Sequence, residues 1–148
     1  AITYLEPDHH VVRYVPWTRL RKDEHDNVIG VLGAAFKLRP DEEYLSATWV
    51  EYFRGVRDQC VIAAVKVIRA SDIEVKPRSG FAIGNVARVK ETCLADPQKH
   101  KVRIIHEPED DNVAHTALRG WPRDNDSLLD LIAEEIWNEM VLNKDVPA

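Results

Sequence analysis

The sequence predicts an α+β fold in which a mainly antiparallel sheet carries two to four helices on one of its faces, with an amphipathic helix near the C-terminus. Several short runs of β-branched and aromatic residues end at proline or glycine, as strands do. Apolar residues recur at helical spacing in the middle and near the end of the chain. The 148 residues suffice for one domain, which we expect to span residues 1–148.

Composition excludes several classes of protein. Apolar residues make up 45% and charged residues 30% of the chain, which is globular usage. The longest apolar runs, such as residues 61–65, fall far short of the roughly 20 residues that cross a bilayer, and the first residues lack the order of a signal peptide. Cys60 and Cys93 form neither a disulfide framework nor a C-x-x-C pair. We therefore expect a cytoplasmic protein of microbial type with no membrane partner.

Charge is distributed unevenly along the chain, whose formal net charge is −5. From Glu107 onward eleven Asp and Glu face three Lys and Arg, which gives −8 there and +3 for the first 106 residues. A charge of +3 spread over 106 residues is much weaker than the concentrated basic surface of a nucleic-acid-binding protein. We therefore do not expect a nucleic-acid partner.

The first part of the chain predicts strands separated by turns. Residues 9–15 are β-branched and aromatic and stop at Pro16, which indicates a strand. Residues 17–22 suit either a short helix or an extended lead into a turn at residues 23–27. Residues 28–38 then indicate one strand, or two strands broken at Gly33.

The segment from Gly33 to Phe53 combines five aromatic residues with an acidic cluster and permits two interpretations. Pro40 followed by three acids is a favourable helix start, and four apolar residues share a helical stripe. This favours a helix that begins between residues 40 and 48 and ends before Gly55. Alternatively residues 44–46 are extended and only residues 49–53 are helical. The stripe comprises Leu45, Trp49, Tyr52 and Phe53.

The second half of the chain alternates between the two types of element. We expect a helix over residues 58–69, with a strand over 63–68 as the alternative, because this segment is rich in Val and Ile. A short edge strand over 72–76 and a strand over 81–83 follow. Asn85 then caps a helix through residue 93, or the strand continues to residue 89. Residues 102–106 indicate a strand. Asn112 is a plausible N-cap for a short helix over 113–119.

The amphipathic helix near the C-terminus begins at Asp126 or Ser127, and its apolar face runs from residue 128 to residue 141. For the tertiary arrangement, we expect the segments around Val11, Phe36, Phe81 and Val102 to form the sheet. The helices around residues 49, 61 and 128 would cover one face of it.

Few side chains carry a recognisable chemical motif. Ser46 with His115 is one combination for nucleophilic catalysis, although no G-x-S-x-G elbow surrounds Ser46. A group of four histidines and one acid contains metal-ligating residue types but lacks the spacing of a zinc motif, so we predict no metal site. That group is His9, His10, His106, Glu107 and His115.

A second constellation follows the order of the strands. Basic residues on the first strand (His10 and Arg13) precede Tyr44-Leu-Ser46, and Glu107 follows the late strand. This order resembles that of the ADP-ribosyltransferases, in residue order only. The resemblance implies that the basic residue and the hydroxyl position NAD, and that the acid steadies an oxocarbenium-like centre. Alternatively Arg13 pairs with a carboxylate across the sheet and Tyr44 packs in the core.

Two further features suggest binding. His115 and Arg119 are four residues apart, so one helix face would present both to an anion, unless both are simply solvated. Trp17, Trp49 and Trp121 lie near the ends of segments, where exposed indoles would indicate a protein interface.

These observations lead to two hypotheses of function. The first is a small accessory or protein-interaction domain that works with a larger partner and needs no cofactor. The second is a small enzyme acting on NAD or a nucleotide-like ligand, which requires its site residues to converge in one cleft. Its catalytic candidates are His10, Arg13, Ser46, Glu107 and His115, and its ligand-binding candidates are Tyr44, Trp49 and Arg119.

Overall fold

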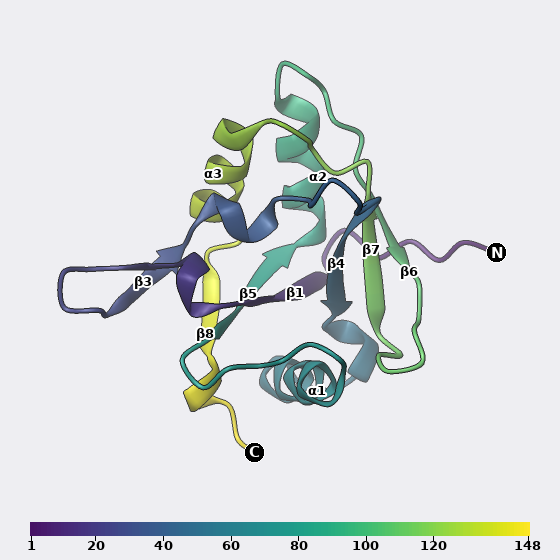
Figure 1. Cartoon of the computed structure of the whole chain (residues 1–148). Helices are drawn as coiled ribbons and strands as arrows, with labels where there is room; N and C mark the ends of the chain where they lie inside the picture. Colours follow the sequence, from purple (N-terminus) through teal and green to yellow (C-terminus); the bar gives the residue numbers. More distant parts are fainter.

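The computed structural model describes residues 1–148 and contains a six-stranded sheet, a two-stranded hairpin and three α-helices (Figure 1). The strands are β1 His10–Val15, β2 Leu20–Lys22, β3 Val28–Val31, β4 Tyr44–Trp49, β5 Gly80–Asn85, β6 Arg103–His106, β7 His115–Arg119 and β8 Glu139–Leu142. The helices are α1 Arg57–Ala70, α2 Val86–Ala95 and α3 Asp126–Glu135. Four 3-10 turns complete the chain: η1 Trp17–Arg19, η2 Gly33–Phe36, η3 Glu51–Phe53 and η4 Asn143–Asp145.

The large sheet has the strand order β6-β7-β4-β1-β5-β8 and every pairing in it is antiparallel. The predicted α+β fold with a mainly antiparallel sheet is therefore confirmed. Its central strand, β1, is rich in valine, and Val11, Val12 and Val15 are fully buried. The pairing of β1 with β5 spans six residue pairs, whereas that of β1 with β4 spans two.

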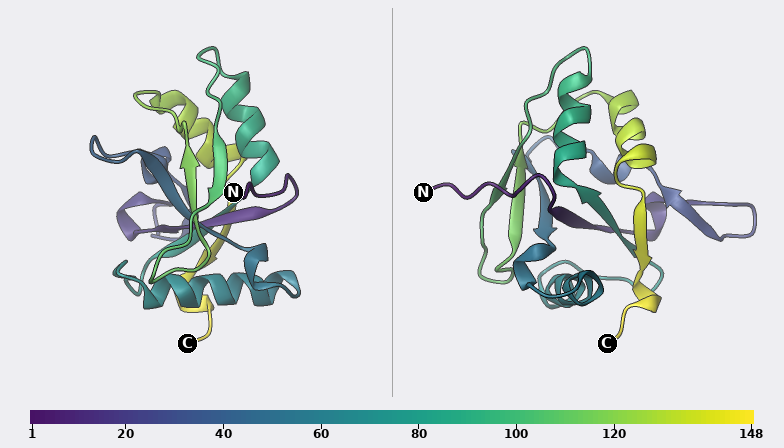
Figure 2. Two further views of the ribbon diagram at one scale, coloured as in Figure 1. Left: turned by 90° about the vertical axis from the view of Figure 1, so that its right-hand side faces the viewer. Right: turned by 180° about the vertical axis from the view of Figure 1, so that it is seen from behind.

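Helices cover both faces of this sheet, so the prediction of helices on one face is wrong. Helix α1 lies on one side, and α2 and α3 lie on the other (Figures 1 and 2). The cause is that successive residues of the central strands are apolar on both sides. Val11 and Ala82 contact the core under α2 and α3, whereas Val12 and Phe81 contact the core over α1.

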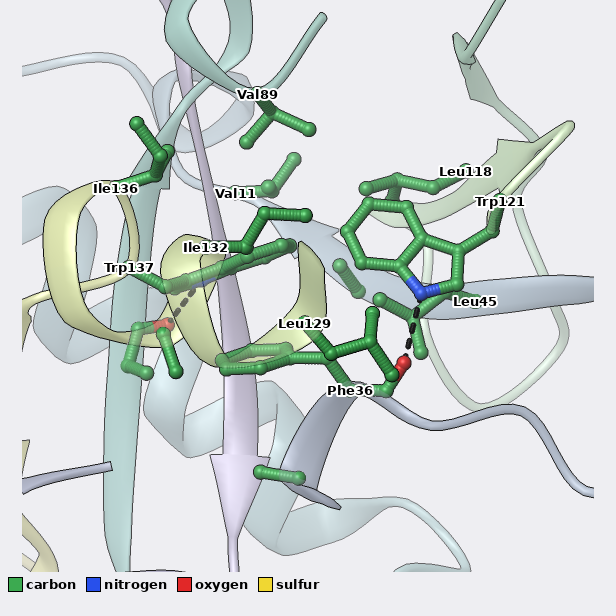
Figure 3. Close-up of a cluster of buried hydrophobic side chains, with 14 of the residues drawn as sticks. Val11, Phe36, Leu45, Val89, Leu118, Trp121, Leu129, Ile132, Ile136 and Trp137 are labelled. Atoms are coloured by element: carbon green, nitrogen blue, oxygen red, sulfur yellow. Dashed lines mark hydrogen bonds between the residues drawn. The ribbon is translucent and has the colours of Figure 1, made fainter. Parts of the chain in front are cut away.

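The larger core is built around Trp137 (Figure 3). The Trp137 ring stacks on Phe36 with ring centroids 4.5 Å apart and meets Trp121 edge-on at 5.8 Å. Both buried indole N–H groups have acceptors, since Trp137 donates to the carbonyl of Ala82 at 3.0 Å and Trp121 to that of Phe36 at 2.7 Å. A Cβ at Gly84 would lie 3.0 Å from the Trp137 ring, so the absent side chain makes room for the indole. This core fixes η2 against α3 and the sheet.

The predicted strands over residues 9–15, 81–83 and 102–106 and the helix over residues 58–69 are confirmed as β1, β5, β6 and α1. The Asn85 cap is also confirmed, because its side chain accepts from the Arg88 N–H at 2.9 Å. The alternative of a strand that continues to residue 89 is wrong.

The helix favoured between residues 40 and 55 is wrong, and its extended alternative is correct for residues 44–46. These residues form β4, which pairs with β7 through five residue pairs. Only η3 is helical in this region. Alternation decides the outcome, since Leu45 and Ala47 enter the larger core while Ser46 between them does not.

Residues 113–119 contain β7 instead of a helix, and Asn112 caps a turn by accepting from the Ala114 N–H at 3.0 Å. The helix from Asp126 stops at Glu135, and the residues beyond it return to the sheet as β8. Residues 34–36 belong to η2 and not to a strand, and residues 72–76 form no strand.

None of the three helices is both long enough and apolar enough to cross a membrane.

Candidate functional site

A cleft of about 580 Å³ lies where β1 and β4 separate. The pairing of these strands stops after Val12 and Thr48, and Figure 1 shows them running on at a wide angle to each other. Both walls carry charged groups, and we call this feature the polar cleft. Its charged and polar lining includes Arg13, Arg19, Lys37, Arg39, Glu42, Ser46, Thr48, Ser71, Asp72, Glu109, Asp111, Asn112 and His115.

A serine and a histidine meet in the polar cleft. The register of β4 with β7 sets Thr48 opposite His115 and Ser46 opposite Ala117, so Ser46 and His115 are diagonal neighbours on one face of the sheet. The Ser46 Oγ atom lies 3.1 Å from Nε2 of His115. His115 is only 4% exposed, whereas Ser46 is partly exposed. The hydroxyl is therefore accessible and the imidazole behind it is held by the protein.

The hydrogen bonds of His115 define which ring nitrogen carries the proton. Its Nδ1 atom lies 2.8 Å from the main-chain oxygen of Glu107. A carbonyl oxygen can only accept, so in the neutral ring Nδ1 carries the hydrogen and Nε2 presents a lone pair. The Ser46 hydroxyl then donates to Nε2. This is the arrangement of a general base beside a nucleophile, with a carbonyl in the orienting role that an acid has in a catalytic triad.

The loop between β6 and β7 positions the imidazole. Asn112 donates from Nδ2 to Thr48 Oγ1 at 2.9 Å and thereby ties the loop to β4. The ring of Tyr44 meets the ring of His115 edge-on, with centroids 5.8 Å apart. These contacts restrict the rotation of His115 without using its Nε2 atom.

Glu109 is the acid nearest to the reactive nitrogen. Its Oε1 atom lies 3.7 Å from Nε2 of His115, and its side chain is 48% exposed. An imidazolium formed when His115 accepts a proton would lie within ion-pair distance of this carboxylate. Solvent weakens the attraction between the two charges because the carboxylate is half exposed.

Arg13 lines the same cleft and stabilises β4 through a hydrogen bond to its main chain. It donates from Nε to the carbonyl of Ala35 at 2.9 Å and from Nη1 to the carbonyl of Ser46 at 2.7 Å. Burial lowers the pKa of Arg13 to about 10, partly offset by the charge of Glu42, and the group stays protonated at neutral pH. The guanidinium therefore connects β1, η2 and the serine strand where main-chain pairing has ended.

Three of the sequence-predicted residues form a chain of contacts beside the cleft. Arg119 donates to both carboxylate oxygens of Glu107, from Nε at 2.7 Å and from Nη2 at 2.8 Å. Its guanidinium also lies over the Tyr44 ring, 4.7 Å from the centroid. The hydrogen bonds from Arg119 lower the pKa of Glu107, and burial raises the pKa of Tyr44, with Glu109 and Glu107 adding to that rise.

The structure leaves His10 and Trp49 outside the polar cleft. His10 Nδ1 lies 2.7 Å from Glu51 Oε2, so this imidazole has its own partner. Trp49 donates to Nδ1 of His9 at 3.1 Å and packs against Tyr52. Arg13, Ser46 and His115 are therefore brought together, Glu107, Tyr44 and Arg119 lie next to them, and the remaining two lie elsewhere.

The ADP-ribosyltransferase-like order does not produce a common site for its three kinds of residue. Glu107 is not part of the cleft lining, and Arg119 occupies both of its carboxylate oxygens. Only its main-chain oxygen contacts the site, through His115. The structure also contains no group of three or more His, Cys, Asp or Glu side chains that is arranged to hold a metal ion.

Sequence reasoning did not identify Thr48, Glu109 and Asn112 as site residues. Asn112 was expected to cap a helix, and its side chain uses the same acceptor chemistry to cap a turn instead. Glu109 lies in an acidic loop, Glu107-Pro-Glu-Asp-Asp111, that looks solvated in sequence. Only the pairing of β4 with β7 would have indicated that this loop closes one wall of the cleft.

Comparison with known protein families, with curated proteins and with solved structures finds no match to this chain.

Proposed function

We propose that this protein is a small enzyme that binds a small polar molecule in the polar cleft, with Ser46 as nucleophile and His115 as general base. The observation that carries the proposal is the 3.1 Å contact between Ser46 Oγ and His115 Nε2, with the tautomer of His115 set by the Glu107 carbonyl. The cleft volume of about 580 Å³ falls in the range of small-molecule sites and admits a ligand of nucleotide size.

The reaction class that suits this pair is acyl transfer or ester hydrolysis. Ser46 Oγ attacks a carbonyl carbon while its proton passes to Nε2 of His115. The imidazolium then gives that proton to the leaving group, and an ester on Ser46 remains. Water, deprotonated by the same imidazole, releases the acyl group and restores the hydroxyl. The carboxylate of Glu109 lies 3.7 Å from Nε2, within ion-pair distance of the imidazolium in both steps.

A serine-directed probe tests this proposal without knowledge of the substrate. We would treat the folded protein with a fluorophosphonate, which attaches to an activated serine hydroxyl, and locate the adduct by peptide mass spectrometry. Ser71 is the matched control, because it lines the same cleft but donates its hydrogen to the Ile68 carbonyl at 2.6 Å. Ser127, which is exposed, controls for simple access.

We expect the adduct on Ser46 alone. The variant His115→Gln should slow its formation by roughly 100-fold or more, the usual contribution of a general base. Equal slow labelling of Ser46 and Ser127, or labelling of Ser46 that His115→Gln leaves unchanged, would refute the proposal.

A protein partner is the second candidate function, and one surface feature favours it. Four rings at the end of β4 pack together with centroids between 5.2 and 5.8 Å apart. Tyr52 among them is 37% exposed. Partly exposed Trp and Tyr side chains are typical of interfaces. The ring cluster comprises His9, Trp49, Tyr52 and His106.

Recovery of a partner from cells would test this second candidate. Tagged wild-type chain should retain a partner that the Tyr52→Ala variant loses. Ile29→Ala, which alters an exposed residue of the β2–β3 hairpin, should retain it. Failure of the wild-type chain to recover any protein beyond an untagged control would count against this candidate.

We also propose a reducing, cytoplasmic setting. Cys60 and Cys93 are both free and buried, and they lie in the separate cores on opposite faces of the sheet. Two thiols that the sheet separates in this way suit a compartment that keeps cysteines reduced.

A further inference from the structure

We infer that Arg13 is an anion-binding residue of the polar cleft and that the ligand bound there carries a carboxylate or phosphate group. The inference rests on the proposed function, because it names the charge of the substrate that Ser46 would attack.

The guanidinium of Arg13 is held in place by hydrogen bonds from two of its three nitrogens. Two of its nitrogens donate to the carbonyls of Ala35 and Ser46. The third nitrogen, Nη2, has no hydrogen-bond partner in the protein. It is not a buried unsatisfied atom either, since the Arg57 Nε atom alone is in that condition. Nη2 therefore keeps some exposure to solvent, on a side chain that lines the cleft.

Arg13 also has no counter-ion in the protein. No carboxylate lies within 4.0 Å of it, and the nearby Glu42 is turned toward Arg39, whose main-chain N–H it accepts at 2.8 Å. A partly buried cation without an ion-pair partner is unfavourable, because it has lost hydration and the charge of Glu42 offsets that loss only in part. An anion on Nη2 would supply the missing negative charge. Its hydrogen bond would be charge-assisted and placed next to the strand that carries Ser46.

Two other arginines of this protein have their hydrogen-bond donors or their charge paired within the chain. Arg69 uses all three of its nitrogens on the Asn143 side chain and on carbonyls of the C-terminal segment. Arg119 is paired with Glu107. Arg69 has an acceptor for each nitrogen and Arg119 has a carboxylate partner. Neither needs an added anion, so both serve as internal references for Arg13.

The charges around Arg13 limit the ligand to a small anion or a zwitterion. Arg19, Lys37 and Arg39 add positive charge to the lining of the cleft. Its acidic lining residues would repel an extended polyanion; they are Glu42, Asp72, Glu109 and Asp111. Inorganic phosphate and acetate are therefore suitable probes for the two kinds of anionic group.

The test uses the wild-type protein and observes arginine side chains directly. Two-dimensional NMR of the Nε–Hε groups is recorded while phosphate or acetate is added at constant ionic strength, with chloride as the balancing salt. The Arg13 signal should shift and saturate, whereas the Arg69 signal should not move. Saturation with phosphate alone or with acetate alone would support the inference and identify the group.

Absence of a saturable Arg13 shift with both probes would overturn the inference. So would a shift of equal size at Arg69, since that would indicate a general salt effect.

Thermal unfolding gives a second measurement. At about ten times the Kd, the effective anion should raise the Tm of the wild-type protein by roughly 4 °C. Arg13→Gln should abolish the rise, and Lys90→Gln, which removes an exposed charge on α2 outside the polar cleft, should preserve it. An undiminished rise in Arg13→Gln would contradict the assignment.

The result can be separated from that for the proposed function. Ser46→Ala should retain the anion response, because Arg13 contacts only the main chain of Ser46. An Arg13 response without labelling of Ser46 would leave the anion site in place and remove the enzyme proposal. If Ser46 is labelled but the Arg13 signal does not respond to either anion, this inference alone is refuted.

Discussion

The hydroxyl of Ser46 lies 3.1 Å from Nε2 of His115, across two adjacent antiparallel strands. Both residues belong to strands of the central sheet and not to mobile loops, so their separation is set by the register of β4 with β7. Groups placed on regular elements hold their geometry more tightly than groups on loops. The pair is therefore preorganised before a ligand enters.

Replacement of Glu107 by Gln should reduce stability near neutral pH by about 1 kcal/mol, because two charge-assisted hydrogen bonds from Arg119 are weakened. The pKa of Glu107 is lowered in the folded state. Its contribution is therefore present above the unfolded-state pKa and is lost as pH falls through the folded-state pKa. Urea unfolding at several pH values should show the difference from wild type disappearing in acid.

The matched control for that experiment is Glu139→Gln. Glu139 pairs with Arg57 at 2.8 Å, but its side chain is 54% exposed, so we expect little effect on stability. Equal losses in both variants would show that the Glu107 pair has no special contribution.

Gly33→Ala should separate η2 from α3. A Cβ there would lie 2.8 Å from the main-chain nitrogen of Asp130 and 2.9 Å from the main-chain carbon of Leu129, and backbone cannot move aside cheaply. We expect a loss of about 1–3 kcal/mol in chemical unfolding. Gly30→Ala is the control, since its Cβ would meet nothing closer than 3.9 Å. Similar stability of the two variants would contradict this account of the packing.

Cys93 should be inert to alkylation in the folded protein. Burial, with a smaller contribution from Asp96, raises its pKa to about 12, and the thiolate is the reactive form. In the Cys60→Ala variant, iodoacetamide at pH 8 should react only after denaturant is added. Reaction of the folded protein at the rate of a free thiol would show that Cys93 is accessible.

The same raised pKa predicts a loss of stability in alkali. Above the unfolded-state pKa the unfolded chain releases the Cys93 proton while the folded protein keeps it, so unfolding becomes more favourable up to about pH 12. Unfolding measured between pH 8 and pH 10 should therefore show a smaller decline in Cys93→Ala than in the wild-type protein.

Periodicity predicted the elements whose apolar pattern fits one type of structure. The central strand β1 and the strand β6 are of this kind. Residues 44–53 are not, because Leu45 and Trp49 are four apart and a spacing of four places side chains on one face of a helix and of a strand alike. Pairing with β7 decides for the strand, and that partner is about 70 residues away in sequence.

The candidate site could be predicted only in part for the same reason. His115 and Arg119 share a face in β7 as they would in a helix, so the spacing identified a pair without identifying its neighbours. Arg119 turns to Glu107, while His115 turns to Ser46. Local sequence predicts neither of these two partners, since each depends on which loop packs over the sheet.

The most direct test of the central claim measures the rate of fluorophosphonate attachment to Ser46 as a function of pH, beside an NMR titration of His115 in the same protein. The account predicts that the rate rises with pH and levels off, with a midpoint equal to that of the imidazole, and that His115→Gln removes this dependence. A rate that increases about tenfold per pH unit without levelling off, as expected for direct ionisation of the hydroxyl, would contradict the role of His115 as the base.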